Sequence, residues 1–258
     1  MGRITVGQIR YDLFQINEND GGDLNVDAYL LCGENQAVLI DCLQDTEELF
    51  DTVKRLTSMP LSVIITHGHP DHAGKGLKQF FDAGVPVYMH EDDFALYKDM
   101  FSGQFDTDMF QPLHEGDVFD PGGLNLKTIL CGGHTPGSVV LLDEKNGRLF
   151  TGDAVGSGLF WMQIPGCIPL YEFHDNLKRL IRRVDHIGSL KVYPGHRWQS
   201  PVQLNLQYLK DTLALTEMIL RHEDNGKELT MMFDGAPLNY KEASYGMMLG
   251  YAYNPLNL

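Results

Sequence analysis

The sequence predicts an α/β fold that forms a single domain over residues 1–258. Short runs rich in β-branched residues, such as residues 61–65, end at turns that contain glycine or proline, as buried strands do. Apolar residues at helical spacing follow several of these runs, for example over residues 173–184. No linker or short repeat divides the chain, and a hydrophobic content of 43% is sufficient for one substantial core.

The N-terminal part of the chain is expected to be mainly β structure. Adjacent antiparallel strands are predicted at residues 11–16, 28–32 and 37–42. Asp41, at the end of the third strand, is either an acceptor for the outer ring nitrogen of a metal-binding histidine or an ordinary turn acid. Asp45 is expected to cap a helix that buries Leu49 and Val53.

Three histidines and an aspartate follow the buried strand that ends at Ile65. The stretch reads Thr66-His67-Gly68-His69-Pro70-Asp71-His72-Ala73-Gly74. Imidazole and carboxylate groups at this density, held at a rigid strand end, are typical of a metal site. We expect a helix to begin near Asp71, with His67 and His69 directed toward one ion and Asp71 and His72 toward a second.

Further donor residues occur in similar settings later in the chain. His134 lies in Gly-Gly-His-Thr-Pro-Gly, Asp153 in Thr-Gly-Asp and His196 in Pro-Gly-His, each after a short strand-like run. Any one of them alone would be an ordinary turn residue. Their joint occurrence beside glycine at strand ends predicts that they complete the coordination of two ions.

This set of residues resembles that of the metallo-β-lactamase superfamily, and the similarity spans roughly residues 9–225. The resemblance implies a four-layer αββα sandwich, in which two mixed β-sheets are flanked by helices. It also implies that one metal is bound by His67, His69 and His134. The other metal would be bound by Asp71, His72 and His196, and Asp153 would bridge the two ions.

Helices and strands alternate through the rest of the predicted fold. Helices are expected at residues 77–84, 91–100, 173–184 and 202–220, and strands at residues 85–89, 124–130, 138–142 and 149–151. The last helix is expected to open with Ser200-Pro201, a capping pattern with proline at the first helical position. Residues 101–113 show no periodicity and are expected to form a loop near the site mouth or a connector.

A glycine-rich apolar segment follows Asp153. It contains Phe160, Trp161 and Met162, which we expect to form a mobile wall of the substrate pocket, with core packing of Trp161 as the alternative. The tail over residues 227–258 is rich in methionine and tyrosine. It is expected to pack on the domain, partly over the site, or on a partner subunit in a homodimer.

Composition limits the class of partner and the cellular location. The formal net charge of −15 disfavours nucleic acid and acidic membrane surfaces as partners, which leaves a small-molecule substrate. No apolar stretch approaches the ~20 residues that a membrane span needs. The cysteines form no Cys-x-x-Cys pair and residues 1–19 lack the apolar region of a signal peptide, so reduced thiols and a cytoplasmic location are expected.

The donor set indicates the metal and its chemistry. It contains no thiolate and suits Zn²⁺, although Fe²⁺ or Mn²⁺ would also be accepted. Two ions bridged by Asp153 would share a hydroxide at neutral pH, and Asp71 would orient this hydroxide or accept its proton as the catalytic residue. The predicted enzyme is therefore a dinuclear metal-dependent hydrolase.

The bond that is cleaved follows from the branch of the family that the chain resembles. Asp153 stands where several β-lactamases carry a cysteine ligand, so the chain is more similar to the glyoxalase II-like branch. Ser138 and the sequence Tyr-Pro-Gly before His196 depart from true glyoxalase II, which puts glutathione recognition in doubt. We expect hydrolysis of a thioester, ester or lactone. The alternatives are a mononuclear iron enzyme like the sulfur dioxygenases, a phosphodiesterase on the same scaffold, and a metal-holding module without turnover.

Overall fold

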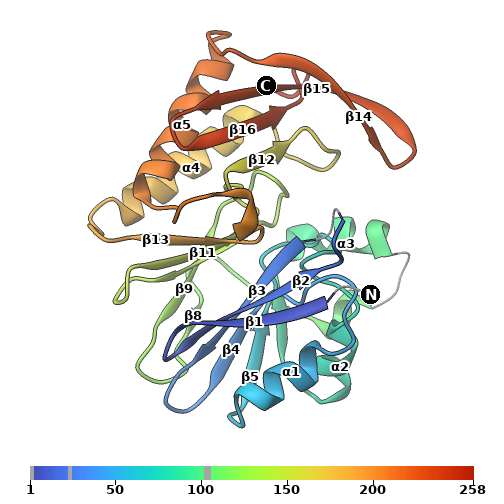
Figure 1. The fold of residues 1–258 in the computed structure, drawn as a ribbon, viewed down its shortest axis with the longest axis vertical. Coiled ribbons are helices and arrows are strands. Elements are labelled where there is room, and N and C mark those ends of the chain that lie inside the picture. Colours follow the sequence, from blue (N-terminus) through green and yellow to red (C-terminus); the bar gives the residue numbers. More distant parts are fainter. Residues whose placement is uncertain (1–2, 23–24, 102–105) are drawn as a thin grey trace.

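The structure is a computed structural model that describes residues 3–22, 25–101 and 106–258. Its first sheet has the strand order β1-β2-β3-β4-β5-β6-β7 (Figure 1). The strands are β1 (Arg3–Arg10), β2 (Leu13–Asn19), β3 (Asn25–Cys32), β4 (Ala37–Ile40), β5 (Leu61–Ile64), β6 (Val87–Met89) and β7 (Gln111–Pro112). Strands β1 to β4 pair antiparallel, as predicted for β2 to β4, and β4 to β7 pair parallel.

The second sheet has the strand order β13-β11-β10-β9-β8. Its strands are β8 (Val118–Phe119), β9 (Leu126–Leu130), β10 (Val139–Asp143), β11 (Arg148–Gly152) and β13 (Lys191–Pro194). The predicted hairpin joins β10 to β11, and β13 returns parallel to β11. Because β11 and β13 are parallel, their carboxyl ends lie at the same edge of the sheet.

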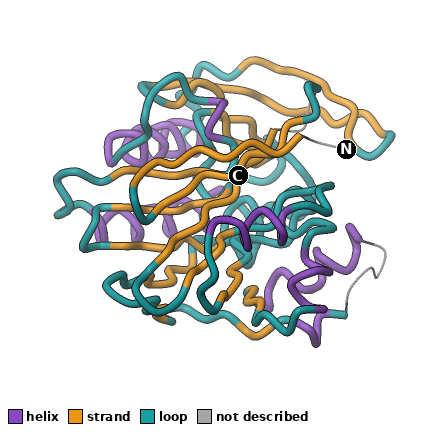
Figure 2. Tube along the Cα trace, turned by 60° about the horizontal axis from the view of Figure 1, so that its bottom comes forward, coloured by secondary structure: helices purple, strands orange, loops and turns teal. Residues whose placement is uncertain are grey.

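The two sheets pack face to face, with helices on the outside. Helices α1 (Leu49–Leu56), α2 (Leu77–Asp82) and α3 (Phe94–Phe101) cover the first sheet, and α4 (Leu170–Val184) and α5 (Leu206–Leu220) cover the second. Figure 2 shows helices on both sides of the strand-rich middle. The predicted four-layer αββα sandwich is therefore confirmed.

Successive side chains of a strand belong to different hydrophobic cores, one between the two sheets and one between a sheet and its helices. In β3, Ala28 and Leu30 pack toward the helices, whereas Tyr29 and Leu31 pack between the two sheets. Strand β10 alternates in the same way. Because successive side chains of a strand point to opposite faces, strands buried on both faces read as continuous apolar runs.

The C-terminal tail forms strands of a further sheet, which the sequence did not indicate. Its strand order is β12-β16-β15-β14, and the strands are β12 (Leu159–Met162), β14 (Lys227–Phe233), β15 (Ala236–Tyr245) and β16 (Met248–Tyr253). Strand β16 pairs parallel with β12, the strand that follows Asp153. The assignment of residues 1–258 to a single domain stays a prediction.

The helix expected near Asp71 does not form. Residues 66–76 make turns and bends instead, and helix α2 begins only at Leu77. The backbone of this segment is bound to the chain after β4: Cys42 N donates to His72 O at 2.7 Å, and Gly74 N donates to Leu43 O at 2.9 Å. These long-range hydrogen bonds replace the ones that a helix would make within itself.

The predicted N-termini of helices α1 and α5 are also wrong. Helix α1 begins at Leu49 without a side-chain cap, and Asp45 forms an ion pair with Lys75 instead. Helix α5 begins at Leu206, where the Asn205 side chain accepts a hydrogen bond from the backbone of Gln207 at 2.8 Å. Asn is as good a helix cap as Ser, so local preference does not choose between the two starts.

Among the residues that the structure describes, no helix is long and apolar enough to cross a lipid bilayer. Of the stretch expected to be a loop or connector, residues 102–105 lie outside the described residues.

Candidate metal centre

All the residues predicted to bind metal meet in the segments that follow β5, β9, β11 and β13. One group of ligand atoms, which lie within 4.8 Å of one another, belongs to His67, His69 and His134. A second group with the same spacing belongs to Asp71, His72, Asp153 and His196. The two groups match the two sets that the resemblance assigned to separate ions.

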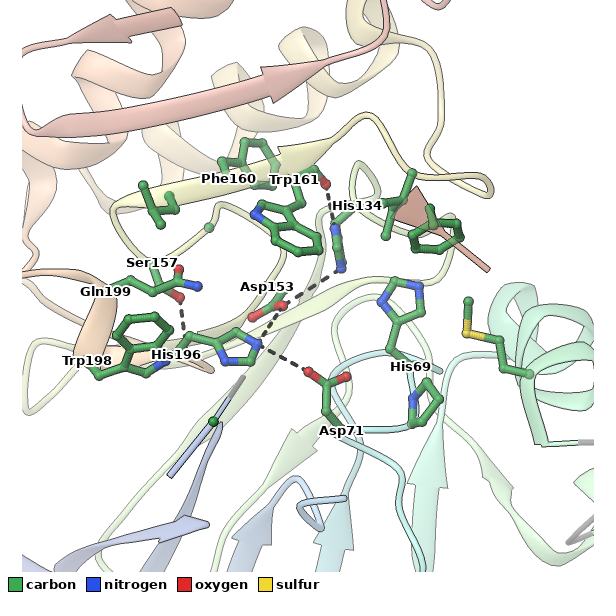
Figure 3. A pocket seen from close by; sticks show the side chains of 17 residues that line it. His69, Asp71, His134, Asp153, Ser157, Phe160, Trp161, His196, Trp198 and Gln199 are labelled. Atoms are coloured by element: carbon green, nitrogen blue, oxygen red, sulfur yellow. Dashed lines mark hydrogen bonds and ion pairs between the residues drawn. The ribbon is translucent and has the colours of Figure 1, made fainter. Parts of the chain in front are cut away.

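Asp153 lies between the two groups (Figure 3). Its Oδ2 atom is 3.2 Å from His196 Nε2 and 3.8 Å from His134 Nε2. Its Oδ1 atom is 3.6 Å from His72 Nε2. A single carboxylate is thus within reach of imidazoles from both groups.

Hydrogen bonds at the outer ring nitrogen hold three of the histidines in place. His72 Nδ1 lies 2.8 Å from Asp41 Oδ2, His134 Nδ1 lies 2.7 Å from the Trp161 carbonyl, and His196 Nδ1 lies 2.8 Å from the Asn25 carbonyl. Because these oxygens accept a hydrogen bond from Nδ1–H, each ring directs its Nε2 atom into the site, the atom that would bind a cation. Of the two roles expected for Asp41, its contact with His72 supports the acceptor for the outer nitrogen of a ligand histidine.

Buried atoms in the site fit divalent ions. The Nε2 atoms of His67, His69 and His72 and Oδ1 of Asp153 are buried and have no hydrogen-bond partner among the described residues. A buried polar atom without a partner costs stability unless something binds it. Imidazole nitrogens and carboxylate oxygens without a thiolate suit Zn²⁺ and also Fe²⁺ or Mn²⁺.

The electrostatics of the two groups differ. Burial, together with the neighbouring imidazoles, lowers the pKa of His67 well below its usual value, and burial lowers the pKa of His69 to about 3. Burial alone would raise the pKa of Asp153, but nearby His196 and His72 outweigh it and hold this pKa well below its usual value. At neutral pH His67 and His69 are therefore uncharged and Asp153 is ionised, the forms that bind a cation.

A cavity of about 630 Å³ opens above these ligands. Phe160 and Trp161 line it, as predicted for the substrate pocket, whereas Met162 is buried in the core. Trp161 is 43% exposed, which favours the pocket wall over core packing as its role. Trp198 and Gln199, which follow His196, also line the cavity, although neither was singled out from the sequence.

The family model of the metallo-beta-lactamase superfamily matches residues 21–201. The chain belongs to this superfamily. A hydroxyacylglutathione hydrolase of Francisella philomiragia is 28% identical over 70% of the chain and 67% of its own length. The human acyl-coenzyme A thioesterase MBLAC2 is 32% identical over 60% of the chain. The match spans only 61% of the human protein, less than two thirds of its length.

A solved structure supports the fold of this superfamily member. The metallo-beta-lactamase from Pontibacter korlensis superposes with a TM-score of 0.65 at 23% identity, over 83% of this chain and 99% of that one. At this level of identity the likeness concerns the fold. Family membership and the hydrolase names of the relatives make the chain a metal-dependent hydrolase.

Asp93 connects the loop that carries His67 and His69 to the loop that carries His134. The sequence analysis did not single it out. Its buried carboxylate accepts hydrogen bonds from Gly68 N at 2.8 Å, Gly137 N at 2.6 Å and Thr135 Oγ1 at 2.7 Å. Gly68 lies between His67 and His69, and Thr135 follows His134. Burial raises the pKa of Asp93, although these hydrogen bonds lower it. In the sequence Asp93 belongs to an ordinary acidic helix start, so only its long-range contacts identify it.

Gly195 has no side chain, and the space beside its Cα atom is occupied by His72 and Asp153. A methyl group there would overlap the His72 ring and lie 2.7 Å from Asp153 Oδ1. We expect Gly195→Ala to displace these ligands and lower kcat/KM by about 100-fold, because a shift of about 1 Å at a reacting centre costs that much. Gly188→Ala is the matched control, since a methyl group at Gly188 meets nothing within 4 Å. Equal kcat/KM and metal content for both variants would contradict the expected crowding.

Proposed function

We propose that the chain hydrolyses a thioester, ester or lactone of a small molecule at a site that holds two divalent ions, most simply Zn²⁺. The observation that carries this proposal is the meeting of two ligand groups at Asp153, below a cavity of small-molecule size. The names of relatives that cleave acyl thioesters support the choice of bond.

Different residues of the chain would bind the ions and orient the ligands in this reaction. Two bound divalent ions would supply Lewis acidity and a water molecule whose pKa is near 7. The hydrogen bonds to Asp41, Trp161 and Asn25 hold the ligand histidines at fixed angles, so that little reorganisation is needed during the reaction.

Asp71 lines the cavity and is partly exposed there, with Oδ2 3.3 Å from His196 Nε2. In the proposed reaction the water oxygen bonds to the carbonyl carbon, and the bond from that carbon to sulfur or oxygen breaks. The leaving atom keeps the electron pair. Asp71 accepts the proton of the attacking water and returns it to the leaving atom. The products are a carboxylic acid and a thiol or alcohol, or the hydroxy acid from a lactone.

Asp71→Asn tests this role. The amide oxygen can still bind a cation but the side chain no longer accepts a proton, so we expect kcat to fall by about 100-fold while metal content is retained. Steady-state kinetics and metal analysis of the same preparation measure both quantities. Asp92→Asn, a change in a largely exposed side chain, is the control. An unchanged kcat in Asp71→Asn would exclude Asp71 as the proton acceptor.

A substrate panel separates the proposal from its alternatives. The metal-loaded protein is offered thioesters, lactones and phosphodiesters, with an oxygen electrode and metal analysis alongside. Two ions per chain and cleavage of thioesters or lactones are expected. A single iron with oxygen uptake would favour the sulfur dioxygenase alternative, and phosphodiester cleavage alone would favour the phosphodiesterase. Bound metal without any turnover would favour a binding module.

A further inference from the structure

The cavity above the ligands is walled mainly by apolar and aromatic side chains. These are Met100, Leu159, Phe160, Trp161, Ile164, Trp198 and Phe233. They come from α3, from β12 and the loop after it, from the segment after His196 and from the end of β14. A concave apolar surface of this extent beside a reactive centre recognises a ligand of matching polarity.

Cationic side chains are missing from this wall. None of the described residues that line the cavity is lysine or arginine, and neither type occurs in residues 23–24 or 102–105. The acids in the lining, Asp71 and Asp153, are used by the metal centre. A substrate carboxylate or phosphate that lay against this wall, away from the ions, would lose its hydration without gaining a charged partner, and the chain charge of −15 adds to its exclusion.

The cavity has a deep side and an open side. Phe160 is 1% exposed and packs against Phe173 and Tyr251 in the core, with ring centroids 5.0 Å apart in both pairs. Trp198, which also lines the cavity, is 54% exposed and marks its solvent side. With the thiol or alcohol part of the substrate directed toward the open side, the deep apolar wall is available to the acyl group.

We propose that the substrate carries an uncharged, predominantly apolar acyl group, which lies against Phe160, Ile164 and Phe233. Anionic acyl groups such as succinyl are excluded by the same wall. This inference rests on the proposed function, because it specifies the acyl part of the thioester or ester that the site would hydrolyse.

Acyl selectivity is measured with thioesters of one neutral thiol, N-acetylcysteamine. Acetyl, butyryl and hexanoyl thioesters are compared with the succinyl thioester on the metal-loaded protein. We expect kcat/KM to rise about threefold to fourfold for each added methylene. The succinyl thioester is expected to react about 100-fold more slowly than the butyryl thioester of equal chain length. Equal rates for the butyryl and succinyl thioesters would overturn the inference and leave the proposed function standing.

Variants of the wall locate the selectivity. Phe233→Ala is expected to lower the hexanoyl-to-acetyl ratio of kcat/KM by about tenfold, because it removes a large apolar contact. Met232→Ala, on the same strand but 66% exposed, is the matched control. Ile164→Lys introduces a cation and is expected to raise the succinyl-to-butyryl ratio by at least about tenfold. Unchanged ratios in both wall variants would contradict the placement of the acyl group.

Binding gives a readout that does not depend on turnover. The two tryptophans of the chain both line the cavity, so their fluorescence reports its occupation. Ketone analogues, in which a methylene replaces the thioester sulfur, are titrated with a hexanoyl or a succinyl group. We expect the hexanoyl ketone to change the fluorescence at concentrations about 100-fold lower than the succinyl ketone. If no acyl compound is hydrolysed, the proposed function fails, and this comparison alone supports or overturns the apolar selectivity.

Discussion

Replacing Asp153 with alanine is expected to lower kcat/KM by at least about 1,000-fold, well beyond the tenfold to hundredfold typical of residues that only orient a ligand. The reason is its position, with imidazoles of both groups within 3.8 Å of its two carboxylate oxygens. Removing this carboxylate would deprive both groups of an anionic side chain that lies within reach of imidazoles from each of them. Metal analysis is expected to show less than two ions per chain.

The matched control for this variant is Asp175→Ala, on the exposed side of α4, where the carboxylate is 78% exposed. Circular dichroism must show that both variants keep the native secondary structure. Full activity of Asp153→Ala with two bound ions would exclude a bridging role. Loss of one ion with full activity would instead assign the reaction to the other group alone.

Asp93→Ala is expected to lower the free energy of unfolding by about 3 to 5 kcal/mol. The carboxylate accepts hydrogen bonds from two backbone amides and one hydroxyl, all buried, and these donors would be left without a partner. Gly137 and Gly68 are close-packed against Asp93, so neighbouring side chains cannot easily fill the space. Urea unfolding of the metal-free protein measures the change without a contribution from bound ions.

Two comparisons test the cause of this loss. Asp92→Ala, at the exposed neighbouring position, is expected to change the unfolding free energy by less than about 0.5 kcal/mol. Asp93→Asn keeps one accepting oxygen and is expected to lie between Asp93→Ala and the unchanged protein. Equal stability of Asp93→Ala and Asp92→Ala would show that the two ligand loops hold their positions without Asp93.

The ligand residues could be predicted because each carries a local signal. His67, His69 and His72 are dense in sequence, and His134, Asp153 and His196 each stand beside glycine at a strand end. The sequence left the role of Asp41 open between a partner of a ligand histidine and a turn acid, and only its contact with His72 decides for the first. Short-range patterns and the family resemblance were sufficient for the layers of the fold and for the geometry of the two groups.

Contacts between distant segments decided the features that were missed. The turn after His69 is held by the backbone of residues 42–44, which no local preference for a helix at Asp71 reveals. Asp93 has no distinguishing neighbours in sequence and acquires its importance from amides 25 and 44 positions away. Strand β1 and the C-terminal strands depend on pairing partners, and their exposed side chains obscure the alternation that would identify them.

The pairing of β12 with β16 connects the final stretch of the chain to the cavity. Residues 21–201 carry the metal ligands and match the family model, whereas β14, β15 and β16 lie beyond the match. Yet β16 pairs with β12, the strand that bears Phe160 and Trp161, and β14 contributes Phe233 to the same cavity. The final stretch of the chain thus completes a cavity whose other wall residues lie within the family match. Under the proposed acyl selectivity, substitutions in the final stretch would change which compounds are accepted without altering the two ligand groups.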